Sequence, residues 1–147
     1  MDVNILWMSF IDGISTWLAY FIGGVDDLIR ALGIIMAIDF ILGYMVTWFI
    51  QDADSRKAFK GFLKKAAMLL MVAAAVQLDN ATDTGDFMRN AMILFLIGME
   101  GISMIEKLGQ LGIKVPRILQ NTFSQLQNEN EDKPKGSGNN SKNEGEH

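Results

Sequence analysis

Two acidic residues lie inside long apolar stretches of the sequence, and their carboxyl groups are the best candidates for chemistry. Asp39 is the only charged residue in 31–50, and Glu100 interrupts a second apolar run, 91–105. A carboxylate at the centre of a bilayer costs roughly 2.5 to 3.5 kcal/mol on insertion scales, so such an acid is protonated, paired, or turned toward protein or water. The functional interpretation is that both acids face a helix seam that later becomes wet, where their ionisation helps to decide between closed and open assemblies.

A structural role is the alternative for every acid in an apolar segment. Such a residue can cap a helix, or it can hydrogen-bond inside a bundle. This interpretation suits Asp12, which interrupts the first apolar segment, and Asp79, which closes the third. For Asp39 and Glu100 both interpretations stay open.

Enzymatic catalysis finds little support in the sequence. The only histidine, His147, is the final residue, cysteine is absent, and no cluster of potential ligands occurs at metal spacing. We therefore expect a protein that is not an enzyme and that uses no cofactor and no metal. We also expect no nucleic-acid partner.

Helices must position the two acids, and four apolar segments predict them. A helix rises about 1.5 Å per residue, so about twenty residues cross the roughly 30 Å hydrocarbon core of a bilayer. The first segment is amphipathic, and it either spans the membrane or lies on its surface. We predict an all-α membrane protein with three or four transmembrane helices. The predicted helices cover about 3–22, 31–50, 56–79 and 89–107.

The C-terminal part of the chain differs from these segments. Apolar residues at helical spacing predict a short amphipathic helix that lies on the inner leaflet or pairs with a neighbour. The last residues contain no aromatic and no branched aliphatic side chain, a composition typical of disorder. The predicted organisation is an N-terminal amphipathic or transmembrane helix in 1–30, a transmembrane core in 31–110, a juxtamembrane helix in 111–126 and a disordered polar tail in 127–147.

Basic residues predict the orientation in the membrane. The connection 51–65 carries five of them, whereas 79–90 carries only Arg89 beside three acids. Cytoplasmic loops are enriched in Lys and Arg, so the first connection is predicted to be cytoplasmic and the second external, which places the C-terminus in the cytoplasm. The five long side chains are also expected to reach lipid phosphates. They are Arg56, Lys57, Lys60, Lys64 and Lys65.

Small residues on the second segment predict close packing between helices. Gly33 and Ala37 are four residues apart, as are Gly43 and Thr47, and this spacing lets helices approach one another in lipid. Asp39 and Gly43 share one helix face because they are also four residues apart. The packing surface therefore lies on the same helix as the buried acid.

Several short motifs follow one another between about residues 20 and 120. They are Gly23-Gly24 followed by acidic residues, Ile38-Asp39-Phe40 with Gly43, Ser55 with Lys60-Gly61 and Lys64-Lys65, Arg89-Asn90-Ala91, Glu100-Gly101-Ile102-Ser103 followed by Glu106, and Leu111-Gly112 leading to Pro116. In this order the chain resembles the phage holin family of Gram-positive phages, the toxin-secretion and phage-lysis group that includes clostridial holins. Lys107 is a departure, since the family often has asparagine there.

The resemblance implies a holin that forms homo-oligomers in the cytoplasmic membrane of the bacterial host. Such a protein opens lesions that release or activate a cell-wall-degrading endolysin, and the host cell lyses. The implied partners are membrane lipid, further copies of the chain, and the endolysin as a functional partner. Two alternatives stay open: a holin-like pore for non-lytic export of a large protein toxin, and a small ion channel or regulatory membrane protein.

Overall fold

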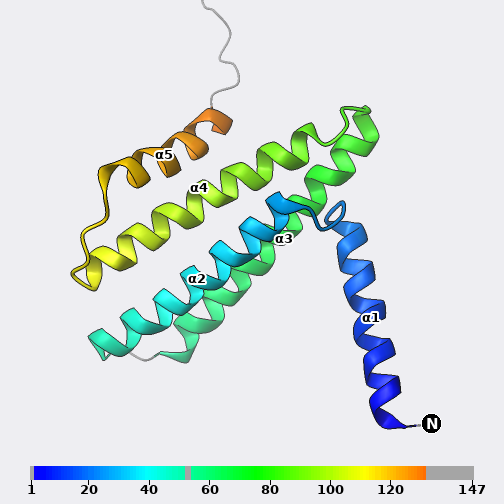
Figure 1. The fold of residues 1–147 in the computed structure, drawn as a ribbon, viewed down its shortest axis with the longest axis horizontal. Helices are drawn as coiled ribbons and strands as arrows, with labels where there is room; N and C mark the ends of the chain where they lie inside the picture. Colours follow the sequence, from blue (N-terminus) through cyan, green and yellow to red (C-terminus); the bar gives the residue numbers. More distant parts are fainter. Residues whose placement is uncertain (1, 52–53, 132–147) are drawn as a thin grey trace, which may run out of the picture.

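The chain folds as a set of α-helices in its computed structural model, which describes residues 2–51 and 54–131. Within those two ranges there are five helices and no strand. The all-α class is therefore confirmed for the described residues. The helices are α1 (Val3–Phe21), α2 (Asp27–Ile50), α3 (Ser55–Thr82), α4 (Phe87–Gln110) and α5 (Arg117–Glu131), as Figure 1 shows.

Three helices, α2, α3 and α4, extend beyond the segments predicted for them. α2 begins at Asp27 because the side chain of Asp26 accepts a hydrogen bond from the backbone N–H of Ile29 at 3.0 Å and caps the helix. α3 continues to Thr82, where Asp83 takes a left-handed conformation with φ of 52° and ends it. Caps of this kind lie outside the apolar pattern, so hydropathy alone places the helix ends too far inward.

Two helices, α2 and α3, are long and apolar enough to cross a membrane. α4 is as long as α2 but carries Arg89, Glu100 and Lys107, so it depends on its neighbours to shield these groups. The predicted spans at 3–22 and 89–107 stay predictions.

The core lies where α2, α3 and α4 meet. Leu32 of α2, Val72 of α3 and Ile93 of α4 are each fully buried there. α4 lies between α5 on one side and α2 with α3 on the other (Figure 1). This order leaves two unlike faces, one formed by α2 and α3 and one formed by α5.

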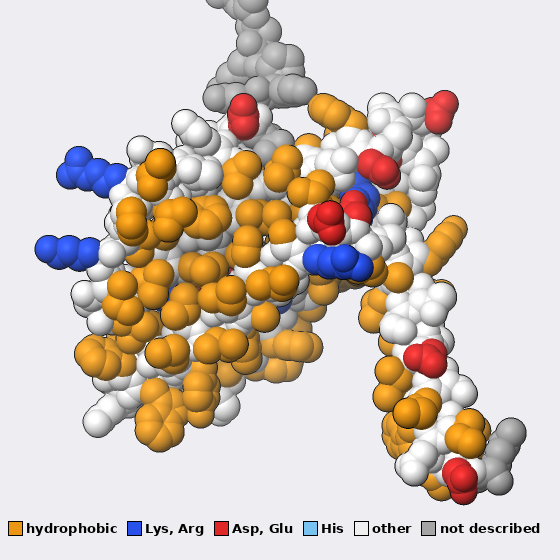
Figure 2. Space-filling model, viewed as in Figure 1, with side chains coloured by type: hydrophobic (Ala, Val, Ile, Leu, Met, Phe, Trp, Pro, Cys, Tyr) orange, Lys and Arg blue, Asp and Glu red, His pale blue; other side chains and the backbone are white. Residues whose placement is uncertain are grey.

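α1 projects away from the other helices (Figure 1). None of its residues is buried, and its large apolar side chains, among them Trp7, Phe10 and Trp17, are exposed. Figure 2 shows hydrophobic side chains both on this projecting helix and over α2. The exposed apolar surface of α1 agrees with either a spanning or a surface position, so this alternative stays open.

α5 folds back along α4 and packs against it closely. Phe123 and Leu126 of α5 reach the core cluster. A Cβ atom at Gly98 would lie 2.8 Å from both the backbone N of Gln127 and the backbone O of Phe123, and a Cβ atom at Gly101 would overlap the Phe123 ring. Two glycines on α4 therefore make this approach possible.

The bounds of α5 differ from the sequence prediction. The helix begins at Arg117 and ends at Glu131 instead of covering 111–126. Residues 127–131, predicted to open a disordered tail, are thus helical, because the backbone of Gln127 is held against Gly98. The rest of that tail, 132–147, lies outside the described residues.

Alanine at Gly101 is expected to displace α5. The added methyl group would enter the space of the Phe123 ring, and overpacking of this kind costs typically about 1–3 kcal/mol. Hydrogen exchange at the amides of Phe123 and Leu126 should therefore become faster. Gly109→Ala is the matched control, because it lies on the same helix and its Cβ would meet nothing within 4 Å. Equal exchange in both variants would contradict the prediction.

Candidate functional site

Four charged side chains from three helices meet inside the bundle. Lys65 of α3 donates a hydrogen bond to Asp39 Oδ2 of α2 at 2.9 Å, and a second one to Glu100 Oε2 of α4. Lys107 of α4 lies 2.7 Å from Asp39 Oδ2 and donates to the backbone oxygen of Asp39 at 3.0 Å. We call these four residues the charge network. Its two negative and two positive groups balance.

The charge network is largely shielded from solvent. The side chains of Asp39 and Glu100 are 5% and 1% exposed, and those of Lys65 and Lys107 are 16% and 24% exposed. Removing charges from water is costly, but at contact distance in a medium of low dielectric constant the attraction between opposite charges is strong. The two acids can therefore stay ionised inside an apolar bundle only while the lysines remain beside them.

One oxygen of the charge network is incompletely satisfied. Asp39 Oδ1 is buried and accepts no hydrogen bond of standard geometry from the described residues, although Ser103 of α4 interacts with this carboxylate. A buried acceptor without a full complement of hydrogen bonds costs about 1–3 kcal/mol. The burial of the Asp39 carboxylate is therefore incompletely compensated by hydrogen bonds.

The spacing of residues along each helix explains how the charge network forms. Glu100 and Lys107 are two helical turns apart, so they lie on one face of α4. Gly43 lies one turn beyond Asp39 on α2, and a Cβ atom there would lie 3.4 Å from Lys107 Nζ. The lysine stem therefore crosses α2 at a residue without a side chain.

Lys65 lies apart from the other predicted lipid-binding residues. Its position on α3 is in register with Met68, Val72 and Asp79, all buried, which places Lys65 on the inner face. Its ammonium group binds two carboxylates instead of being free for phosphates. The other four residues, Arg56, Lys57, Lys60 and Lys64, are exposed on the same helix, and their predicted role stays a prediction.

The predicted packing residues of α2 have different surroundings. Gly33 and Ala37 are exposed, and a Cβ atom at Gly33 would meet nothing within 4 Å. The hydroxyl of Thr47 donates to the backbone oxygen of Gly43 at 2.8 Å, within its own helix. Gly43 lies against Lys107 of α4. Packing of other helices at Gly33, Ala37 and Thr47 stays a prediction.

Another buried charged residue, Arg89, was not identified as a site residue from the sequence. Its side chain donates to the backbone oxygen of Ile22 at 2.6 Å, to that of Gly24 at 3.0 Å, and to both carboxylate oxygens of Asp26. A Cβ atom at Gly23, whose φ is +78°, would lie 2.9 Å from Arg89 Nε. We call this arrangement the Arg89 clamp. It fixes the segment between α1 and α2 to the start of α4.

The charge of Arg89 acts directly on Asp26. Hydrogen bonds from the guanidinium group and from the Ile29 N–H lower the pKa of Asp26 from 3.8 to about 2. The carboxylate therefore stays ionised well into the acid range. The sequence held one usable signal for the clamp, namely that Arg89 is in helical register with Ile93, Leu96 and Glu100 on the buried face of α4.

Asp79 has the structural role that the sequence allowed. Its carboxylate accepts hydrogen bonds from the backbone N–H groups of Met88 at 2.9 Å and Arg89 at 2.7 Å, and from the hydroxyl of Thr84 at 2.7 Å. It thereby satisfies free N–H groups in the first turn of α4. The end of α3 and the start of α4 are thus tied together.

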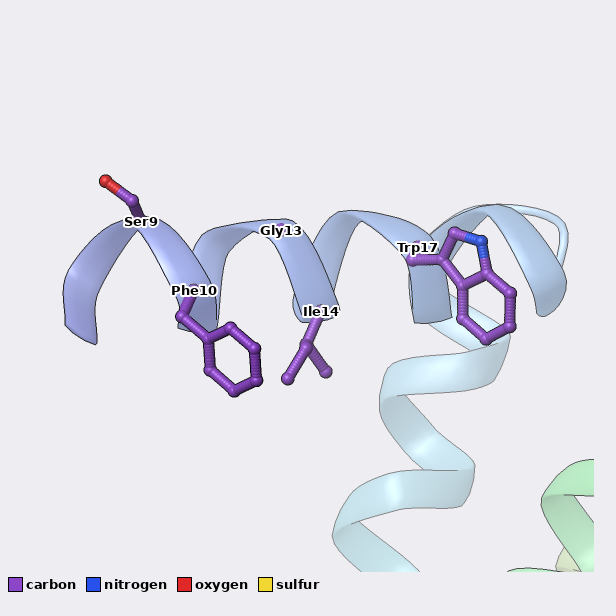
Figure 3. A pocket seen from close by; sticks show the side chains of 5 residues that line it. All are labelled: Ser9, Phe10, Gly13, Ile14 and Trp17. Carbon is purple, nitrogen blue, oxygen red and sulfur yellow. The ribbon is translucent and has the colours of Figure 1, made fainter. Parts of the chain in front are cut away.

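The exposed surface of α1 carries a shallow groove (Figure 3). Phe10, Ile14 and Trp17 point to one side of the helix there, and Ser9 and Gly13 complete the lining. None of these residues is charged. In the part of the chain that the structure describes, no group of three potential ligands is placed to hold a metal ion.

Comparison with known proteins identifies the family. The bacteriophage holin family model matches residues 16–128. A probable holin of Bacillus phage phi105 is 32% identical over 130 residues, which cover 87% of this chain and 93% of that protein. An uncharacterized protein of Listeria monocytogenes is 35% identical over 109 residues, covering 74% of this chain and 78% of the relative. A third relative, from Clostridium perfringens, is 30% identical over 126 residues, covering 85% and 91% respectively.

No solved structure matches the chain. The family and the two apolar helices α2 and α3 together indicate a membrane protein. The match includes all four residues of the charge network and every residue of the Arg89 clamp. The chain belongs to the bacteriophage holin family.

Proposed function

We propose that this protein is a holin that oligomerises in the cytoplasmic membrane of its bacterial host and opens lesions there. The lesions let an endolysin reach or act on the cell wall, and the cell lyses. Family membership supports the holin role. The observation that carries the mechanism is the charge network, because Asp39, Lys65, Glu100 and Lys107 join three helices that must separate if water is to enter.

The charge network acts as a lock on the closed protomer. While Lys65 joins Asp39 to Glu100, neither carboxylate faces lipid and the bundle stays dry. A buried charge left without its partner costs about 3–5 kcal/mol. A water-filled lumen instead hydrates the freed groups. Opening is therefore cooperative, since the lumen that hydrates the acids forms only when many protomers rearrange together.

The lock places the two acids at the centre of the gating step. Asp39 and Glu100 turn toward the lumen when their lysine partners leave. The positively charged side chains of α3, predicted to be cytoplasmic, hold this helix at the lipid headgroups during the change.

Neutralising the acids is expected to change the time at which lesions form. Asp39→Asn and Glu100→Gln each leave a lysine without its full negative charge, so the closed bundle is weaker and lysis should start earlier at equal expression. The double variant should start earliest. Glu106→Gln on the exposed side of α4 is the matched control and should keep the normal time. Unchanged timing in all acid variants would exclude the lock.

A second experiment separates the holin from the alternatives. The protein is expressed with and without a cytoplasmic muralytic enzyme while membrane potential, viability and culture turbidity are followed. Abrupt depolarisation after a delay, with clearing only when the enzyme is present, is the expected result. Release of a co-expressed toxin from living cells would instead indicate export. A lasting membrane potential with continued growth would indicate a small ion channel or a regulatory membrane protein.

A further inference from the structure

The surface of the protomer divides into an apolar side and a polar side. Large hydrophobic residues are exposed along the whole of α2 and α3, for example Ile34, Ile41 and Trp48 on α2 and Leu70 on α3. On α4 the exposed large hydrophobic residues all lie in the first turn. α5 has two in its own first turn. The division therefore runs between α2 with α3 on one side and α4 with α5 on the other.

Beyond its first turn, the outward side of α5 is polar. Gln120, Asn121, Gln125 and Asn128 are exposed. Gln120 Nε2 donates to the backbone oxygen of Val115 at 3.1 Å, and every side-chain amide has further donor and acceptor positions that need hydrogen-bond partners. Transfer of an amide group into hydrocarbon without a hydrogen-bond partner is strongly unfavourable. This side of α5 therefore cannot face lipid.

α5 nevertheless reaches the middle of α4. It starts at Arg117 beyond the C-terminal end of α4, and the Gln127 backbone lies against Gly98, the twelfth residue of that 24-residue helix. The ten residues between Arg117 and Gln127 rise about 15 Å, which is half of a roughly 30 Å hydrocarbon core. If α4 crosses the bilayer beside α2 and α3, the side-chain amides of α5 lie at the depth of the hydrocarbon core.

We propose that the α4–α5 side of each protomer faces other copies of this chain around a water-filled lumen, with Gln120, Asn121 and Gln125 in contact with the water. The α2–α3 side then faces lipid. The inference rests on the proposed function, because it takes the bundle as membrane-spanning and the assembly as open. Beyond the proposed function, the inference says which side of the protomer contacts water, and it places α5 inside the assembly.

Cysteine substitutions test the assignment directly, because the chain has no native cysteine. Gln125→Cys on α5 and Ile41→Cys on α2 form a matched pair, since both positions are exposed on their helices. Full-length variants are placed in vesicles of phosphatidylglycerol and phosphatidylethanolamine. Release of trapped dyes of graded size, labelling by a water-soluble maleimide, and linking by a bismaleimide are then measured.

The expected result is fast labelling and cross-linking of Cys at position 125 but not at 41. The labelling rates should differ by at least about tenfold, because the reactive thiolate forms in water and not in lipid. Slow labelling at 125, fast labelling without any link between chains, or links through position 41 instead would each overturn the inference. Dye release reports separately on lesion formation, so vesicles that retain every dye would count against the proposed function while labelling still decides the place of α5.

Discussion

Replacing Lys65 with methionine is expected to destabilise the closed protomer by about 3–5 kcal/mol, the usual cost of breaking a buried ion pair by removing one partner. Glu100 is 1% exposed, and Lys65 is the cation that pairs with it in the described structure. Asp39 would keep Lys107 at 2.7 Å. The substitution therefore leaves one carboxylate with no compensating charge and the other with half of it.

Two readouts follow from the loss of Lys65. Urea unfolding in detergent should show a lower midpoint, and lysis should start earlier at equal membrane levels. Lys64→Met is the control, because Lys64 is exposed and does not belong to the charge network. It should stay close to the wild type in both measurements.

A paired substitution separates charge balance from packing. Lys65→Met combined with Glu100→Gln removes one positive and one negative group. The remaining members, Asp39 and Lys107, then balance each other. The double variant should recover a large part of the stability lost in Lys65→Met alone, because substitutions at two contacting residues do not change stability additively. Additive losses would mean that Lys65 contributes through its apolar stem and not through its charge.

Local patterns in the sequence predict part of this structure well. Hydropathy predicts α2 and α3, and the isolated charges within apolar runs point to Asp39 and Glu100, which the structure brings together through one lysine. These features depend on residues near one another in the chain. Such patterns can be read without knowing how the helices are rotated.

Helix rotation and chain reversal explain what the sequence did not predict. Five basic residues precede the apolar part of α3, and only the rotation of that helix selects Lys65 as the inward one. In the sequence, Arg89 is counted with the charges of a predicted loop. Its role depends on the backbone oxygens of Ile22 and Gly24, which only the folded chain places beside it. The docking of α5 depends on Gly98 meeting a backbone nearly thirty residues later.

Replacing Arg89 with lysine is expected to release the segment between α1 and α2 although the charge is kept. The guanidinium group of Arg89 donates at once to Ile22, Gly24 and Asp26, and a single ammonium group cannot match that planar fork. Each hydrogen bond to a charged group contributes about 1.5–3 kcal/mol, so losing two of the three partners is a large effect for one substitution.

Hydrogen exchange at Gly23 and Gly24 is the direct measurement for Arg89→Lys, and it should become much faster. Arg30→Lys is the control. Arg30 is exposed and its ion pair with Asp27 measures 3.6 Å. Surface ion pairs contribute little to stability, so exchange at Gly23 and Gly24 should hardly change in this variant. Protected glycine amides in Arg89→Lys would show that the segment is held by something other than the clamp.

The dependence of the Arg89 clamp on pH gives an independent check through Asp26. The pKa of Asp26 falls from 3.8 to about 2 on folding, so ionised Asp26 stabilises the folded state above pH 3.8, and this contribution disappears as the pH falls toward 2. The stability difference between the wild type and Asp26→Asn should therefore be constant from neutral pH down to about pH 4 and shrink below it. In the Arg89→Lys background the difference should be smaller and should be lost nearer to pH 3.8, because the bidentate partner that lowers the pKa is gone.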